Sequence, residues 1–288
     1  MKSSVKLFLF GSLCAALIAL HWSGPTFSEE SLKGKRVLVT GASTGIGEQV
    51  AYHYARMGAQ IVITARRESV LKEFIKKCLD LGAQKALYIA ADMAEIADAD
   101  RVVEFAEKQL QGLDYVVLNH IGSSPYGMWD GDVDFVRWLM QVNFHSYVKI
   151  AVKALPALEK TNGSIVVVSS LLGKMCSPFA LPYAATKFAL NGFFGSLQHE
   201  LAMKQSNVSI TICILGLIDT ERAMKKIKGY IDMPAYPAHE AAFQIIKAGA
   251  LRQDEAFYPW YTFYLTLFRD WFPYHRDQFI RTVYKYQP

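Results

Sequence analysis

The stretch RVLVTGASTGIGEQVAYHYARMGAQIVITARR, residues 36–67, joins two β-branched runs through a glycine-rich turn and a helix-length segment. The runs at 36–40 and 60–64 predict buried parallel strands, and residues 48–57 predict a helix between them. Glycine lets the backbone of such a turn approach a phosphate closely, and the amides and dipole of the following helix attract the anion. The stretch therefore predicts a strand, turn and helix unit that binds a dinucleotide.

Further β-branched runs follow at 86–90, 115–119, 164–169 and 208–215, with amphipathic stretches of helical length between them. This alternation predicts the α/β class, with one doubly wound, Rossmann-like domain and a mostly parallel sheet of six to seven strands. We assign residues 30–255 to this domain, because no linker rich in proline or glycine and no internal repeat divides it. Ligands of such sheets bind at the carboxyl ends of the strands.

The composition excludes several other classes of protein. The chain has 288 residues, of which 52% are hydrophobic and 20% charged, so it is neither disordered nor fibrous. Its four cysteines are far apart and its histidines show no ligand spacing, so we expect neither a disulfide framework nor a metal site. The net charge of +5 is dispersed, and we expect no nucleic-acid partner.

The end of the second predicted strand indicates which dinucleotide binds. NAD sites of this kind usually carry an acidic residue there, whereas this chain has Arg66 and Arg67. Two guanidinium groups suit a 2′-phosphate, so we expect NADP(H) as the cofactor. Glu68 fits the first turn of the next helix, and Arg67 alone would also fit a solvated surface.

The cofactor contacts expected from these positions form two sets. The glycine turn contributes Gly41, Ala42, Ser43, Thr44, Gly45, Ile46 and Gly47. The ends of the third and fourth strands contribute Asp92 and Met93 near the adenine ring, and Asn119, His120 and Ile121 beside its ribose.

A candidate catalytic group follows the fifth predicted strand. Tyr183 and Lys187 are four residues apart and share one face of a predicted helix, where an ammonium would stabilise a phenolate. Ser170, at the end of the strand, is expected to bind the substrate oxygen, and Asn143 to hold a water that passes protons to Lys187. A tyrosine and a lysine at this spacing are common on amphipathic helices, so the prediction depends on the serine and the glycine turn upstream.

In their order and spacing these motifs resemble the short-chain dehydrogenase/reductase family over about residues 34–250. The resemblance is carried by TGASTGIG (40–47), LNHIG (118–122), Asn143, Ser170 and the Tyr183 and Lys187 pair. It implies hydride transfer between a nicotinamide and a secondary alcohol or ketone, with Tyr183 as acid and base. It also implies that Lys187 binds the nicotinamide ribose and that Ile218, Asp219 and Thr220 border the nicotinamide.

Two longer segments resemble the 11β-hydroxysteroid dehydrogenases of this family: NGSIVVVSSLLGK (162–174) and NVSITICILGLIDTE (207–221). They imply a lipophilic substrate, a hydroxysteroid or its ketone. Two alternatives remain open. One is a reductase of retinoid or xenobiotic carbonyls that uses the same residues, and the other is a secreted or membrane protein that kept the fold and lost turnover.

The two ends of the chain predict its location. Lys2 and Lys6 precede an apolar run, so residues 1–24 are predicted to be a signal anchor, with secretion after cleavage as the alternative. The charge distribution places the body in the lumen of the endoplasmic reticulum, where the sequons at Asn162 and Asn207 could be glycosylated. The tail, 256–288, is rich in aromatic residues with arginines between them, which fits either contact with a membrane or a homodimer interface.

Overall fold

The computed structural model describes residues 26–231 and 233–284. Seven parallel strands form one sheet in the order β3-β2-β1-β4-β5-β6-β9. Their bounds are β1 (Arg36–Thr40), β2 (Gln60–Ala65), β3 (Lys85–Ala90), β4 (Tyr115–Leu118), β5 (Ser164–Val168), β6 (Ser209–Leu215) and β9 (Glu255–Tyr258). The prediction of an α/β Rossmann-like fold with six to seven strands is therefore confirmed.

The central strands are buried on both faces, which explains their β-branched composition. Every residue of β5 is buried, and β1 is buried from Val37 onward. The edge strand β9 was not among the runs singled out in the sequence, because its short sequence EAFY does not alternate or form a β-branched run. It pairs with β6 and carries the sheet to Tyr258, three residues beyond the domain end expected at residue 255.

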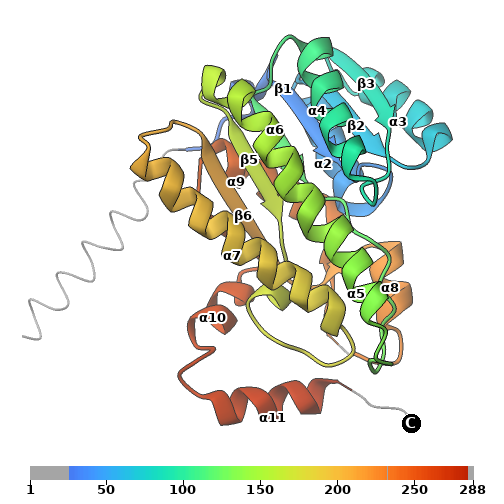
Figure 1. Ribbon diagram of the computed structural model, residues 1–288, viewed down its shortest axis with the longest axis vertical. Coiled ribbons are helices and arrows are strands. Elements are labelled where there is room, and N and C mark those ends of the chain that lie inside the picture. The colour runs from blue at the N-terminus through green and yellow to red at the C-terminus, as the bar shows by residue number, and fades with distance from the viewer. Residues whose placement is uncertain (1–25, 232, 285–288) are drawn as a thin grey trace, which may run out of the picture.

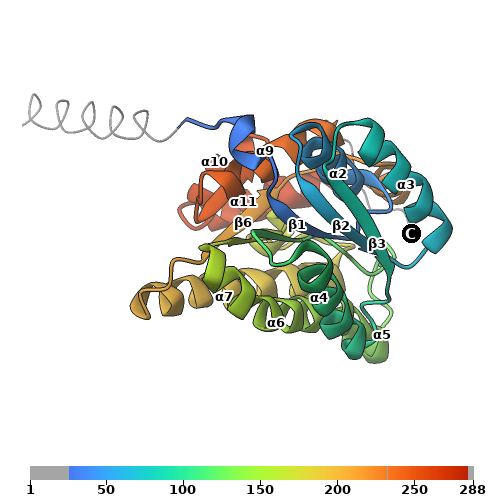
Figure 2. The same ribbon diagram turned by 90° about the horizontal axis from the view of Figure 1, so that it is seen from above.

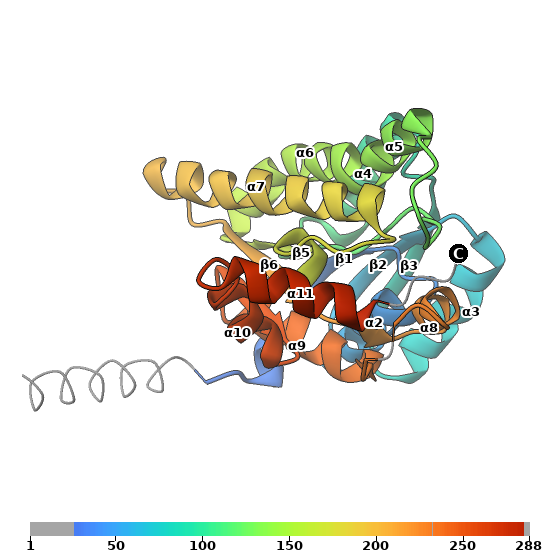
Figure 3. The same cartoon turned by 90° about the horizontal axis from the view of Figure 1, so that it is seen from below.

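Helices cover both faces of the sheet, as Figures 2 and 3 show from opposite sides. One layer contains α4 (Ile96–Leu110), α5 (Val133–Met140), α6 (Ser146–Thr161) and α7 (Leu181–Met203), with a π-helical turn, Gln141–His145, between α5 and α6. The other layer contains α2 (Gly45–Arg56), α3 (Glu68–Asp80) and α9 (Ala238–Ala250). Each layer packs against the sheet through its own apolar cluster.

Short elements lie around the carboxyl ends of the strands. Two 3-10 turns, Glu29–Leu32 and Leu171–Gly173, precede β1 and follow β5. The pair β7 (Ile218–Asp219) and β8 (Tyr236–Pro237) forms a second, two-stranded parallel sheet beside α8 (Glu221–Ile227). These segments supply side chains to the cavities described below.

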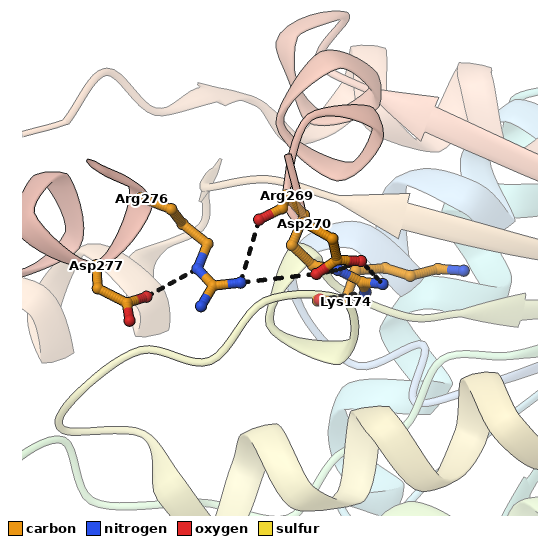
Figure 4. Close-up of polar contacts among 5 residues, drawn as sticks. All are labelled: Lys174, Arg269, Asp270, Arg276 and Asp277. Atoms are coloured by element: carbon orange, nitrogen blue, oxygen red, sulfur yellow. Dashed lines mark hydrogen bonds and ion pairs between the residues drawn. The ribbon is translucent and has the colours of Figure 1, made fainter. Parts of the chain in front are cut away.

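The C-terminal segment folds into α10 (Tyr261–Leu267) and α11 (Pro273–Val283), below the carboxyl ends of β5 and β6 in Figure 1. Arg269, between these helices, donates a hydrogen bond of 2.8 Å to the carbonyl of Lys174. Arg269 also pairs with Asp270, and Arg276 donates to the carbonyl of Arg269 over 3.1 Å (Figure 4). These contacts attach the C-terminal segment to the loop that connects Ser170 with α7.

Within the described ranges, none of the helices is both long and apolar enough to cross a bilayer. The predicted signal anchor, residues 1–24, lies outside the described residues.

Candidate active site

Two adjoining cavities open at the carboxyl ends of the strands, where the fold predicts ligand binding. The larger, about 850 Å³, follows the glycine turn and the end of β2, and we call it the cofactor cleft. The smaller, about 290 Å³ and mostly apolar, lies between α7, α8 and the C-terminal segment, and we call it the substrate cavity. Both are lined by Ile46, Asn119 and Thr220, so the cavities share a wall.

The glycine turn lies at the N-terminus of α2 and has the shape that a pyrophosphate requires. A Cβ on Gly47 would lie 2.3 Å from the carbonyl oxygen of Gly41, and a Cβ on Gly41 would lie 2.6 Å from the Cα of His120. Gly45 has a φ of +61°, which a residue with a side chain rarely adopts. The turn therefore tolerates only glycine at these points, and its backbone is left open toward the cleft.

The two arginines predicted to select the cofactor lie on the rim of the cofactor cleft. Arg66 and Arg67 are exposed and line it, and Arg67 donates to the carbonyl of Ser43 over 3.5 Å. Glu68 points to its own helix instead, since it pairs with Lys72 at 2.9 Å. The guanidinium groups are therefore not neutralised by Glu68, and the site fits a 2′-phosphate.

Most of the other predicted cofactor residues also line the cleft. These are Gly41, Ser43, Thr44, Gly45, Ile46, Asp92, Met93, Asn119, His120, Ile121, Asp219 and Thr220. Ala42 and Gly47 are not on its wall, because Ala42 is buried in the core and Gly47 packs against Gly41. Ile218 lines the substrate cavity. Asn119 donates from its amide to the carbonyls of Thr40 and Gly41, so it also holds the turn in place.

Ser170, Tyr183 and Lys187 line the substrate cavity together. Ser170 caps the turn after β5, where its hydroxyl oxygen accepts a hydrogen bond of 3.1 Å from the amide of Leu172. Tyr183 lies in the first turn of α7, and Lys187 lies one turn further on. The structure thus brings together the strand end and the helix face that the sequence analysis combined.

Lys187 is buried, with an exposed fraction of 1%, and its amine donates a hydrogen bond of 2.8 Å to the carbonyl of Val168. The amine lies 5.6 Å from the ring centre of Tyr183 and 5.6 Å from that of Tyr147. Burial lowers the pKa of Lys187 to about 7, because the interior disfavours its charged form.

Tyr183 differs from the sequence expectation in its proton affinity. Burial raises its pKa to about 12, and the Ser170 hydroxyl opposes this shift only in part. The expected stabilisation of a phenolate by Lys187 does not outweigh desolvation in the protein alone. Tyr183 is therefore a protonated phenol at neutral pH, which suits it to donate a proton.

Asn143 is fully buried in the π-helical turn and lines neither cavity. Its side-chain oxygen accepts a hydrogen bond of 2.7 Å from the amide of Gly122, and its amide donates to the Thr186 hydroxyl over 3.2 Å. The side chain thus ties the loop after β4 to α7 beside Lys187. A π-helical turn interrupts the regular helical hydrogen bonding and often marks functional sites.

Sequence reasoning missed a buried polar network behind the cleft. The His120 ring bonds to the Thr40 hydroxyl at 2.8 Å and to the Ser146 hydroxyl at 2.7 Å. Tyr147 donates to the carbonyl of His120 over 2.7 Å. Burial and the nearby Lys187 lower the pKa of His120 to about 3, so the imidazole is neutral. Only the position of His120 after β4 pointed to it, and Thr40, Ser146 and Tyr147 follow no motif.

Most of the substrate cavity was also missed. Its wall includes aliphatic side chains from β6, α8 and the loops beside them, together with aromatic side chains from three segments. These are Leu171, Leu172, Leu215, Leu217, Ile227, Ile231, Met233, Tyr126, Tyr261 and Tyr284. Across the described part of the chain, no cluster of three His, Cys, Asp or Glu side chains could hold a metal ion.

Comparisons with known proteins agree with this arrangement. The short chain dehydrogenase family profile matches residues 35–230. The hydroxysteroid 11-beta-dehydrogenase 1-like protein of Danio rerio is 72% identical over 288 residues, which cover 100% of both chains. The protein of the same name from Gallus gallus is 60% identical, over 91% of each chain.

Solved structures share the fold. A short chain dehydrogenase from Burkholderia cenocepacia in complex with NADP has a TM-score of 0.70 and 25% identity, over 78% of this chain and 96% of its own. The L-sorbose reductase of Gluconobacter frateurii, complexed with NADPH and L-sorbose, has a TM-score of 0.71 and 22% identity, over 78% of this chain and 95% of its own. The resemblance noted in the sequence is thus confirmed, and the chain belongs to the short chain dehydrogenase family.

Proposed function

We propose that this protein is an NADP(H)-dependent oxidoreductase that interconverts a secondary alcohol and a ketone on a hydroxysteroid. The observation that carries the proposal is the joint placement of Ser170, Tyr183 and Lys187 on the wall of an apolar cavity beside the cofactor cleft. Oxidoreductase chemistry follows from the family, and NADP(H) is supported by Arg66 and Arg67 and by the family structures solved with NADP and NADPH. The steroid is supported by the names of the similar relatives and by the apolar cavity.

The cofactor fits the residues present. The turn from Gly41 to Gly47 would hold the pyrophosphate at the N-terminus of α2, and Arg66 and Arg67 would hold the 2′-phosphate. When bound, the cofactor supplies or accepts a hydride at the nicotinamide ring. The remaining chemistry is the transfer of a proton to or from the substrate oxygen, which this chain must perform.

Ser170 and Tyr183 perform that transfer in the proposed mechanism. Ser170 already accepts the amide of Leu172, so its own O–H is oriented to donate to the substrate oxygen. In the reductive direction, Tyr183 donates its proton to the oxygen as negative charge develops there. Its high pKa keeps the phenol protonated until that charge appears.

Lys187 would restore the proton of Tyr183. With a pKa of about 7 the amine exchanges protons near neutral pH, and the bond to Val168 keeps it beside the tyrosine. Asn143 acts as a positioning residue, since it fixes Gly122 and Thr186 around this pair. The water relay expected at Asn143 stays a prediction.

The test is turnover with NADPH and NADH on 11-keto and 11-hydroxy steroids, retinals and small diketones. We expect NADPH-dependent turnover of the steroids and a loss of about 10²-fold or more in Tyr183→Phe, because the proton donor is removed. NADPH binding, followed by fluorescence, should be unchanged in this variant. Turnover of retinals or diketones alone would replace the steroid with the alternative substrates. Unchanged turnover in Tyr183→Phe would contradict the mechanism.

We further propose that the C-terminal segment contacts a membrane surface. Trp260, Trp271 and Tyr274 are 69%, 67% and 70% exposed, and Phe272 and Phe279 are more than half exposed. Aromatic side chains of this kind favour the interface between headgroups and acyl chains. Co-sedimentation with phosphatidylcholine vesicles should fall in a Trp271→Ala, Phe272→Ala double variant. A loss of dimer in light scattering, with vesicle binding unchanged, would favour the homodimer interface instead.

The location in the secretory pathway remains a proposal supported by the sequence of residues 1–24 and by two exposed sequons. Asn162 and Asn207 are both exposed, and Arg252 donates hydrogen bonds to the backbone carbonyls of both. In cells, we expect a glycosidase to shorten the protein on a gel, and Asn162→Gln with Asn207→Gln to abolish the shift. No shift would contradict a lumenal domain.

A further inference from the structure

Three tyrosines from separate segments line the substrate cavity together with Ser170 and Tyr183. Tyr126 lies in the loop between β4 and α5, Tyr261 begins α10, and Tyr284 follows α11. We call these three side chains the tyrosine group. They lie far apart in the sequence, and the C-terminal segment brings two of them to the cavity.

The tyrosine group is held by packing. The Tyr126 ring lies 5.9 Å from the ring of Phe179 and 5.4 Å from that of Tyr230. Tyr284 forms an antiparallel bridge with Ile231, and its ring lies 6.3 Å from that of Phe179. The three phenols are therefore presented by packed rings and a backbone pairing.

Tyr261 is fixed on the other side of the cavity wall. Its ring lies 5.9 Å from that of Tyr236, and its hydroxyl would lie 2.7 Å from a Cβ placed on Gly216. The absence of a side chain at Gly216, directly after β6, leaves the room that this hydroxyl occupies. Any larger residue there would displace it.

The hydroxyls of Tyr126 and Tyr261 are buried without a hydrogen-bond partner within the described ranges. Tyr284 lies close enough to raise the pKa of both, but it does not reach hydrogen-bond geometry with either. Burial is the larger cause of both raised pKa values, so these phenols are protonated and able to donate. Buried polar groups in native proteins almost always have a partner, so two in one cavity indicate a partner that the cavity receives.

The partner has to be an acceptor oxygen on a largely apolar molecule. Both phenols can donate, and most of the surrounding wall is aliphatic, from Leu171 and Leu172 to Ile227 and Ile231. Neither phenol contacts Ser170 or Tyr183, so the acceptor is separate from the reacting oxygen. The geometry points to a substrate with two oxygen functions, one at Ser170 and Tyr183 and a second bound by Tyr126 and Tyr261. This inference rests on the proposed function.

The experiment compares two steroid ketones that differ only in an oxygen on the ring remote from the reacting carbonyl. KM and kcat are measured with NADPH for the wild type, Tyr126→Phe and Tyr261→Phe, which remove only the hydroxyl. For the ketone with the remote oxygen, we expect KM to rise about two- to tenfold in each variant with little change in kcat. For the ketone without it, the variants should match the wild type. The control is Tyr264→Phe, which changes an exposed tyrosine of the same helix, α10.

The possible outcomes separate this inference from the proposed function. If both variants bind the two ketones as the wild type does, the hydroxyls are satisfied by water and the inference is wrong. An equal rise in KM for both ketones would show a general effect on the cavity, and it too would overturn the inference. If the wild type reduces neither ketone while NADPH binds, the proposed steroid function fails instead.

Discussion

The cofactor cleft and the substrate cavity share a wall, but they are built in opposite ways. The cleft is large and contains much polar surface, and it consists mainly of the backbone of one turn and the ends of neighbouring strands. The cavity is smaller and apolar, and its wall comes from side chains of remote segments between Ile46 and Tyr284. The cleft therefore depends on local geometry, whereas the cavity depends on how the whole C-terminal half packs.

Lys187 is the residue whose loss should have the largest effect, because it belongs to both functions of the cavity wall. In Lys187→Met, we expect turnover to fall by about 10²-fold to 10⁴-fold, since the group that restores the proton of Tyr183 is absent. The measurement is kcat with NADPH. A variant with more than half of the wild-type kcat would show that Lys187 has no catalytic role.

The same variant should be more stable than the wild type near neutral pH. The pKa of Lys187 is lowered from 10.5 to about 7 in the folded state, so unfolding takes up a proton and is favoured below pH 10.5. The penalty to the wild type is full below about pH 7, at roughly 5 kcal/mol, and disappears as the pH rises toward 10.5. Loss of the bond to Val168 offsets about 1–3 kcal/mol of the gain. Urea unfolding at pH 6 and pH 9.5 should show the advantage of the variant shrinking as the pH rises.

Arg66 and Arg67 allow a sharper test of the cleft. In Arg66→Ala with Arg67→Ala, we expect KM for NADPH to rise about 10- to 100-fold, because each lost bond to a charged phosphate costs about 1.5–3 kcal/mol. KM for NADH should stay within about twofold. The matched control is Arg56→Ala, a basic residue of α2 that does not line the cleft. An equal loss for both cofactors would show that the arginines support the turn and do not select the phosphate.

The difference between the two cavities also explains how far the sequence could be interpreted. The glycine turn, Arg66, Arg67 and the Ser170, Tyr183 and Lys187 set follow from spacing along single elements, and the structure places them around the adjoining cavities. His120 and its hydroxyl partners could not be found, because their contacts join β1, β4 and α6 across the sheet. The tyrosine group was hidden for the same reason, since tertiary packing alone brings its members together. The raised pKa of Tyr183 follows from burial, which no spacing reports.

The smallest expected effect concerns the attachment of the C-terminal segment to the cavity. Arg269 donates to the carbonyl of Lys174, four residues after Ser170, and this bond connects α10 and α11 to the catalytic loop (Figure 4). In Arg269→Ala we expect the free energy of unfolding to fall by about 1 kcal/mol, since a single partly buried hydrogen bond is lost. KM for the ketone should rise only a few-fold, because Tyr261 and Tyr284 become less well positioned, while NADPH binding is unchanged.

Hydrogen exchange provides the direct measurement for this last prediction. Amides of residues 273–284 should exchange faster in Arg269→Ala, whereas those of β1 and α2 should not change, because the cofactor cleft does not depend on the C-terminal segment. Arg281→Ala is the matched control, since Arg281 is exposed on α11 and forms no hydrogen bond or ion pair within the described residues. Faster exchange throughout the protein would contradict the separation of the two cavities. Such a result would mean that the C-terminal segment stabilises the whole sheet and that the substrate cavity is no more dependent on it than the cleft.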